Sequence, residues 1–173
     1  MNTEEFKAMQ APLKTRYKEE PGAARITLKA KGTLDDERVV CRVETGRALK
    51  EAGLHPLTGG TGLELCSGDL LLEALAACAG VTLKSVATAI DVPVRGGNVF
   101  VEGDLDFRGT LAVDREAPVG FSAIRLRFEL DTDTDDEKLA TLLKLTERYC
   151  VVLQTLKNSP GLSTACVRQA GRT

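Results

Sequence analysis

Five cysteines are the side chains of this sequence most able to do covalent chemistry: Cys41, Cys66, Cys78, Cys150 and Cys166. Their odd number and scattered spacing, without a CxxC motif, indicate neither a disulfide framework nor a zinc site. The single histidine, His55, has no cysteine at ligand spacing. We therefore expect free thiols and no bound metal, with each thiol either a small core side chain or a reactive group.

Cys78 lies in a long apolar segment, which begins SGDLLLEALAACAG at Ser67 and continues to Ile90. Ser67 is a good N-cap, Asp69 falls in the first turn, and DVPVRGG ends the pattern, so we predict a helix over 67–90. A helix this apolar around its circumference is buried on most sides, and a partner subunit would help to cover it. Cys78 lies beyond the first turn of this helix, so the helix dipole does little to stabilise its thiolate. From the residues alone, Cys78 is either a small core side chain or a reactive thiol.

The rest of the chain predicts a mixed α+β domain. Residues 1–20 read as an N-terminal arm, and residues 21–173 as a single domain. Alternating patterns predict strands over 24–32, 37–46, 98–113, 121–134 and 162–169. Residues 49–66, with four glycines and His55, read as a long irregular loop. A second helix is predicted over 133–150, and a short one follows a break near Cys150.

Composition excludes several classes of partner. A net charge of −2 and a pI near 5.6 give no general attraction to nucleic acid or to anionic membranes. No apolar run appears long enough to cross a membrane, and the first ten residues are charged rather than hydrophobic. A cytoplasmic protein with no membrane or nucleic-acid partner is the expectation.

Two motifs resemble the OsmC/Ohr family of osmotically inducible and organic-hydroperoxide-resistance proteins. GGTG followed by SGDLLLEALAAC is similar to the family segment that begins the central helix and ends at the peroxidatic cysteine. ERYCVVLQTL resembles the second cysteine motif, with Val151 where proline is common. The resemblance implies an OsmC-like α+β fold in the order ββ-α-ββ-αα-β. It also implies that two chains intertwine as a homodimer around buried central helices.

The resemblance places Cys78 at the peroxidatic position and Cys150 at the resolving position. The Cys78 thiolate would attack an organic hydroperoxide and become a sulfenic acid, which Cys150 would convert to a disulfide. An external dithiol would then restore both thiols, and no cofactor would be needed.

The sequence departs from the family pattern at the residues that assist the thiolate. Peroxidase members use an Arg and a Glu, but Gly68 stands where that Glu is expected and Asp69 follows one place later. Four arginines are candidates for the helper: Arg25, Arg38, Arg42 and Arg47. His55 is a further candidate, or it simply caps a turn. These departures favour a second reading, an OsmC-like fold without peroxidase activity that binds a small hydrophobic ligand or serves as an uncharacterised stress-related protein.

The remaining cysteines leave two more alternatives open. Cys66, just ahead of the predicted helix, competes with Cys150 as the resolving thiol or is inert. Cys41 and Cys166 fall in predicted strands, and we expect both to be core side chains. In a third reading, a structural or interaction domain, Cys78 and Cys150 would be core residues too.

Overall fold

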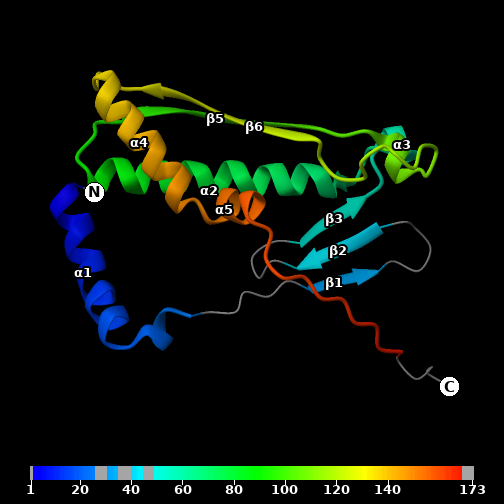
Figure 1. The fold of residues 1–173 in the computed structure, drawn as a ribbon, viewed down its shortest axis with the longest axis horizontal. Helices are drawn as coiled ribbons and strands as arrows, with labels where there is room; N and C mark the ends of the chain where they lie inside the picture. The colour runs from blue at the N-terminus through cyan, green and yellow to red at the C-terminus, as the bar shows by residue number, and fades with distance from the viewer. Residues whose placement is uncertain (1, 26–30, 35–39, 45–48, 169–173) are drawn as a thin grey trace.

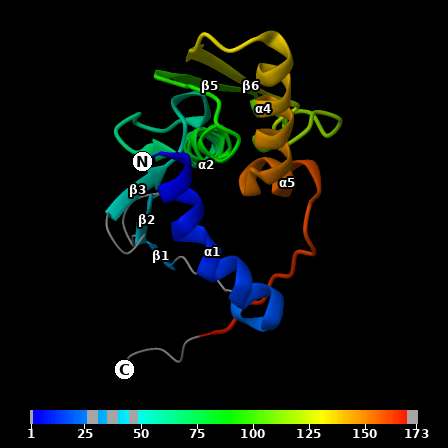
Figure 2. The ribbon, with the colours of Figure 1, turned by 90° about the vertical axis from the view of Figure 1, so that its left-hand side faces the viewer.

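The molecule is built around one long helix, α2 (Ser67–Ala89), which runs beneath a ribbon of two antiparallel strands (Figure 1). These strands are β5 (Gly96–Asp104) and β6 (Ala123–Asp131). Helices α4 (Asp136–Tyr149) and α5 (Val151–Lys157) lie along one side of α2 (Figure 2). This computed structural model describes residues 2–25, 31–34, 40–44 and 49–168.

The other elements precede α2 or connect the two strands above it. They are helix α1 (Thr3–Glu19), the 3-10 turns η1 (Pro21–Ala24) and η2 (Pro56–Thr58), strands β1 (Lys31–Leu34), β2 (Val40–Glu44), β3 (Leu49–Gly53) and β4 (Leu65–Cys66), and the short helix α3 (Phe107–Thr110). Strands β1 to β4 form a second sheet in chain order, near the N-terminal end of α2 (Figure 1). Helix α1 extends away from the opposite end of α2.

Only one face of α2 is buried within the single chain. That face carries five buried side chains at helical spacing: Leu75, Ala79, Leu83, Val86 and Ala87. On another face Val81 is 70% exposed, and Leu71, Ala74 and Ala77 are exposed with it. The expectation of a helix buried on most sides therefore does not hold for one chain taken alone.

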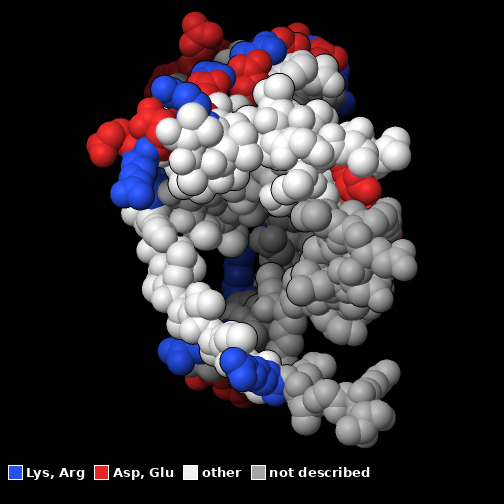
Figure 3. All heavy atoms as spheres, turned by 90° about the vertical axis from the view of Figure 1, so that its right-hand side faces the viewer, with Lys and Arg blue, Asp and Glu red and all other residues white. Residues whose placement is uncertain are grey.

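The β5–β6 ribbon is amphipathic, as its alternating sequence predicts. Its inner face packs Val99, Val101, Leu126 and Phe128 against the α2 core. Its outer face is charged, and Arg125 on this face pairs with Asp104 at 2.5 Å and with Glu102 at 3.3 Å. Figure 3 shows charged side chains gathered over the top of the molecule, above a surface with few charged residues. The side of the ribbon that faces α2 is therefore the apolar, buried side.

Several predicted boundaries are wrong. The segment predicted as a loop over 49–66 contains β3, which pairs with β2, and β4, which pairs with β3. The strand predicted over 98–113 ends at Asp104, because Asp106 accepts a hydrogen bond from the Arg108 N–H and starts α3. Residues 162–168 form no strand within the described chain, so the final β element of the expected order is not seen. The mixed α+β class is confirmed.

The start of α2 also differs from the prediction. Cys66, not Ser67, is the N-cap residue, and its side chain makes no capping hydrogen bond. By contrast, the break predicted near Cys150 is confirmed, since α4 ends at Tyr149 and α5 begins at Val151.

By length and composition, α2 could span a membrane, contrary to the sequence expectation that no segment could. The core helix of a soluble protein has the same properties. Contacts with β5, α4 and α5 account for the apolar side chains on the buried face of α2.

Candidate active site

The site is centred on Cys78, in the middle of α2. Leu75 and Ala79, its neighbours on the buried face, are fully enclosed, whereas Ala74, Ala77 and Val81 are exposed. Cys78 lies between these two faces and is half-buried. A thiol at this border contacts the core and still has a route to solvent, which a reactive cysteine needs.

Cys150 lies in the junction between α4 and α5 and is completely buried. Its N–H donates to the Thr146 carbonyl at 2.9 Å, and its own carbonyl accepts from the Gln154 N–H at 2.9 Å. The residue therefore closes one helix and opens the next, which fixes its backbone. Its side chain packs with Leu75 and Ala79, and Cys78 packs against the same cluster.

The first turn of α5 supplies free N–H groups to the Cys78 thiol. The first N–H groups of a helix have no acceptor within the helix, and the Cys150 side chain does not cap them. Those of Val151 and Val152 are directed at the sulfur of Cys78. The helix junction thus supplies donors to the half-buried thiol.

These contacts separate the acidities of the two thiols. Burial alone would raise the pKa of Cys78, but hydrogen bonds from the Val152 N–H, the Cys150 thiol and the Thr82 hydroxyl lower it below its ordinary value. Burial raises the pKa of Cys150, and the neighbouring charge of Cys78 adds to that rise. Cys78 is therefore the more acidic thiol of the pair, and Cys150 the less acidic one.

Asp69 and His55, two of the proposed helpers, lie away from Cys78. Asp69 is exposed in the first turn of α2, about 14 Å along the helix axis from Cys78. His55 accepts the Leu57 N–H at 3.1 Å through Nδ1 and stacks on Phe107 with ring centroids 5.0 Å apart. Within one chain Asp69 adds negative charge at the start of α2 and His55 caps a turn, and a helper role for either residue stays a prediction.

The candidate arginines lie mostly outside the described part of the chain. Arg38 and Arg47 fall outside the described residues, and of Arg42 only the backbone, in β2, is described. Arg25 is exposed at the end of η1. A helper arginine stays a prediction.

The remaining cysteines divide into three cases. Cys66 is half-buried at the N-cap of α2, about 18 Å along the axis from Cys78, and disulfide formation needs Cα atoms within about 7 Å. It therefore cannot resolve Cys78 of the same chain. Cys166 is exposed, so its assignment to the core is wrong, because the strand expected to bury it is not formed. The side chain of Cys41 lies outside the described residues.

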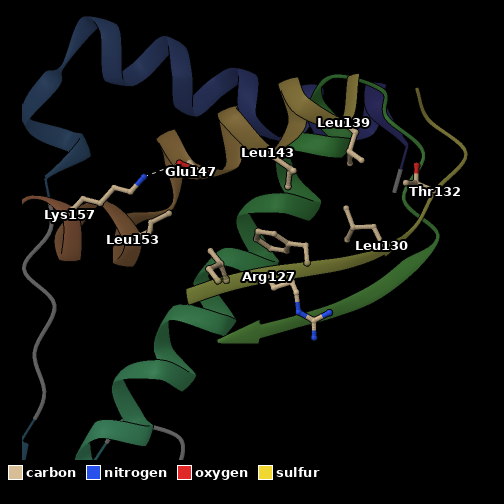
Figure 4. Close-up of a pocket in the computed structure, with 10 residues that line it drawn as sticks. Arg127, Leu130, Thr132, Leu139, Leu143, Glu147, Leu153 and Lys157 are labelled. Carbon is tan, nitrogen blue, oxygen red and sulfur yellow. Dashed lines mark hydrogen bonds and ion pairs between the residues drawn. The ribbon is translucent and has the colours of Figure 1, made fainter. Parts of the chain in front are cut away.

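An apolar groove of about 510 Å³ lies beside the thiol cluster, between β6, α4 and α5 (Figure 4). Leu126, Phe128 and Leu153 line this groove and also pack against the cluster that contains Cys150. At its α5 end Lys157 pairs with Glu147 at 2.9 Å. The sequence did not reveal the groove, because it forms between segments distant in the chain. No group of metal-binding side chains occurs within the described residues.

Residues 60–165 match the sequence profile of the family described as OsmC-like protein. The chain belongs to the OsmC-like family. The matched region begins at the glycine-rich segment before α2 and includes both Cys78 and Cys150. The resemblance seen in the two motifs is thereby confirmed.

Solved structures show the same OsmC-like fold. An OsmC-like protein from Mycoplasma pneumoniae superposes with a TM-score of 0.65 at 15% identity, over 78% of this chain and 89% of its own. An organic hydroperoxide resistance protein OsmC from Legionella pneumophila superposes with a TM-score of 0.61 at 17% identity, over 78% of this chain and 92% of its own. A hypothetical protein from Aquifex aeolicus superposes with a TM-score of 0.60 at 20% identity, over 78% of this chain and 90% of its own. No curated protein sequence is detectably similar to this chain.

Proposed function

We propose that this OsmC-like protein is a thiol-dependent peroxidase that reduces organic hydroperoxides in defence against oxidative stress. One observation carries the proposal: Cys78 lies against Cys150 and receives hydrogen bonds that favour its thiolate, while Cys150 stays protonated. Membership of the OsmC-like family and the similarity to an organic hydroperoxide resistance protein support the same reaction class.

The reaction balances with these two thiols and an external dithiol. The Cys78 thiolate attacks one peroxide oxygen, the O–O bond breaks, and the released alkoxide takes a proton to leave as an alcohol. The Cys78 sulfenic acid then reacts with the Cys150 thiol, which forms the disulfide and releases water. A dithiol reduces this disulfide by exchange and is itself oxidised.

Peroxide consumption with a dithiol tests the proposal directly. The wild-type protein should consume cumene hydroperoxide in the presence of dithiothreitol, and Cys78→Ser should not. Cys166→Ser is the matched control, because this exposed thiol lies outside the site. Loss of activity in the control, or full activity in Cys78→Ser, would contradict the assignment.

A second copy of the chain is proposed to cover the exposed face of α2. Val81 is 70% exposed and Leu71 is 37% exposed on a helix whose opposite face forms the core. Cys78 borders this apolar face, so a homodimer would enclose the route to the thiol and exclude water from it. We place this dimer in the cytoplasm, where reducing conditions keep free cysteines as thiols.

The groove beside β6 favours a second candidate function, the binding of a small hydrophobic molecule without peroxide chemistry. Its volume of about 510 Å³ falls in the range of ligand pockets, and leucines dominate its lining. This function predicts saturable binding of an apolar fluorescent dye, weakened by Leu143→Glu, together with no consumption of peroxide. Dithiol-dependent peroxide turnover would reject it as the main activity.

A further inference from the structure

Thr82 lies one helical turn after Cys78, on the same side of α2. Side chains of a helix lean toward its N-terminus, so the Thr82 hydroxyl is carried back toward residue 78. Thr82 is half-buried, and its hydroxyl interacts with the sulfur of Cys78. The interaction therefore follows from the fixed geometry of one rigid helix.

Three other helical threonines use their hydroxyls differently. Thr88, Thr146 and Thr155 each donate to the carbonyl four residues earlier, at 2.8, 2.8 and 2.9 Å. In this usual arrangement the hydroxyl donates its hydrogen bond to a carbonyl of the helix backbone. Within the described chain Thr82 departs from it, because its hydroxyl is directed at a side chain, the Cys78 thiol.

The elements around Cys78 offer the thiolate neutral donors. The junction of α4 and α5 provides the Cys150 thiol and two backbone N–H groups. The inner face of β5–β6 provides apolar side chains, among them Val99 and Val101. Lys84, the nearest cation along α2, donates to the Val94 carbonyl instead.

We propose that Thr82 is a catalytic residue whose hydroxyl donates to the Cys78 thiolate and keeps it ready for attack on the hydroperoxide. This inference deepens the proposed peroxidase function and rests on it. Thr82 would supply part of the help that the missing Glu gives to other members of the family.

A hydroxyl suits both halves of the oxidation step. It donates to sulfur while the sulfur is charged, and it accepts once the sulfur has become a sulfenic acid with its own O–H. Backbone N–H groups can only donate, so they cannot accept a hydrogen bond from the O–H of the sulfenic acid. A neutral donor also leaves the sulfur more nucleophilic than a strongly acidifying cation would.

The test compares Thr82→Val, which removes the hydroxyl at similar volume, with Thr82→Ser, which retains it. Cys78 is alkylated with iodoacetamide across a range of pH, and the labelled peptide is quantified by mass spectrometry. We expect Thr82→Val to shift the midpoint to higher pH and to slow labelling at neutral pH by roughly three- to tenfold, as for the loss of one ordinary hydrogen bond. Thr82→Ser should stay close to wild type.

Two controls keep the result decisive. The first control is the labelling of Cys66, which should not change. The second is thermal unfolding, which shows whether each variant is folded. If Thr82→Val does not fold, Thr82→Ala replaces it. An unshifted profile in the folded variant, or a Thr82→Ser profile that matches Thr82→Val, would overturn the role of the hydroxyl. Since alkylation needs no peroxide, a wild-type protein that consumes no peroxide would reject the proposed function separately.

Discussion

Cys150 lies beside Cys78 and lowers the pKa of its thiol, although Cys78 lies in α2 and Cys150 lies in the α4–α5 junction, far away in the sequence. The contact exists because α2 and the α4–α5 junction pack against the same apolar cluster. One thiol is half-buried and the other is fully enclosed. This difference in burial suits them to different steps. The accessible sulfur of Cys78 can attack a hydroperoxide, and the enclosed thiol of Cys150 can then form the disulfide.

The pH dependence of labelling follows from the pKa directions. Because hydrogen bonds lower the pKa of Cys78, its alkylation should reach half its maximal rate below the ordinary thiol value of about 8.5. The rate should fall as the pH drops through the Cys78 pKa, since the reactive thiolate is then protonated. Site-resolved labelling with a small alkylating reagent measures this, with exposed Cys166 as the reference thiol. A Cys78 midpoint above that of Cys166 would contradict it.

Substitution of Cys150 separates its two roles. Cys150→Ala removes the donor to Cys78, so the pKa of Cys78 should rise and its labelling at neutral pH should slow several-fold. Cys150→Ser keeps a donor of similar size, so the pKa of Cys78 should change less. Both variants should leave the oxidised Cys78 without an internal disulfide. Identical labelling profiles in the two variants would show that the hydrogen bond has no influence.

Local sequence signals predicted the parts of the fold that depend on local interactions. The apolar run from Ser67 to Ile90 predicted α2, and the alternation within 121–134 predicted β6. The family motifs identified Cys78 and Cys150, which the fold brings together. Each of these signals is a periodicity or a spacing within one segment, which is why it can be read from the chain alone.

Features that depend on contacts between segments were missed. Strand β3 contains charged residues and a glycine, and it is stabilised by its pairing with the preceding strand β2 rather than by its own composition. Thr82 could have been noticed from its spacing of four residues after Cys78, but its orientation required the structure. The groove beside β6 has no sequence signal at all, because three separate elements line it.

The disulfide formed by oxidation distinguishes the resolving thiol. A slight excess of cumene hydroperoxide should produce a Cys78–Cys150 bond within one chain, because both side chains pack in the same apolar cluster. Peptide mapping without reduction identifies the product. A Cys66–Cys78 bond within one chain would contradict this geometry, because about 18 Å of helix axis separates the two residues.

Stability should depend strongly on the core between α2 and α4. Leu142 is completely buried there, with Leu83 and Val86, so Leu142→Ala should lower the free energy of unfolding by about 2–5 kcal/mol. Leu162→Ala is the matched control, since Leu162 is 85% exposed and should change stability by less than about 0.5 kcal/mol. Denaturant titration measures both. Equal effects would mean that Leu162 is covered in solution.

The exposed face of α2 provides the sharpest test of assembly. Val81 is 70% exposed within one chain, so Val81→Glu should cost little in a monomer but should disrupt a dimer that buries this face. Sedimentation equilibrium at micromolar concentration should give a dimer for wild type and a shift toward monomer for Val81→Glu. Val113→Glu is the control, because Val113 is equally exposed, at 73%, in the segment that follows α3. A wild-type monomer would reject the dimer, and dissociation by Val113→Glu alone would place the interface elsewhere.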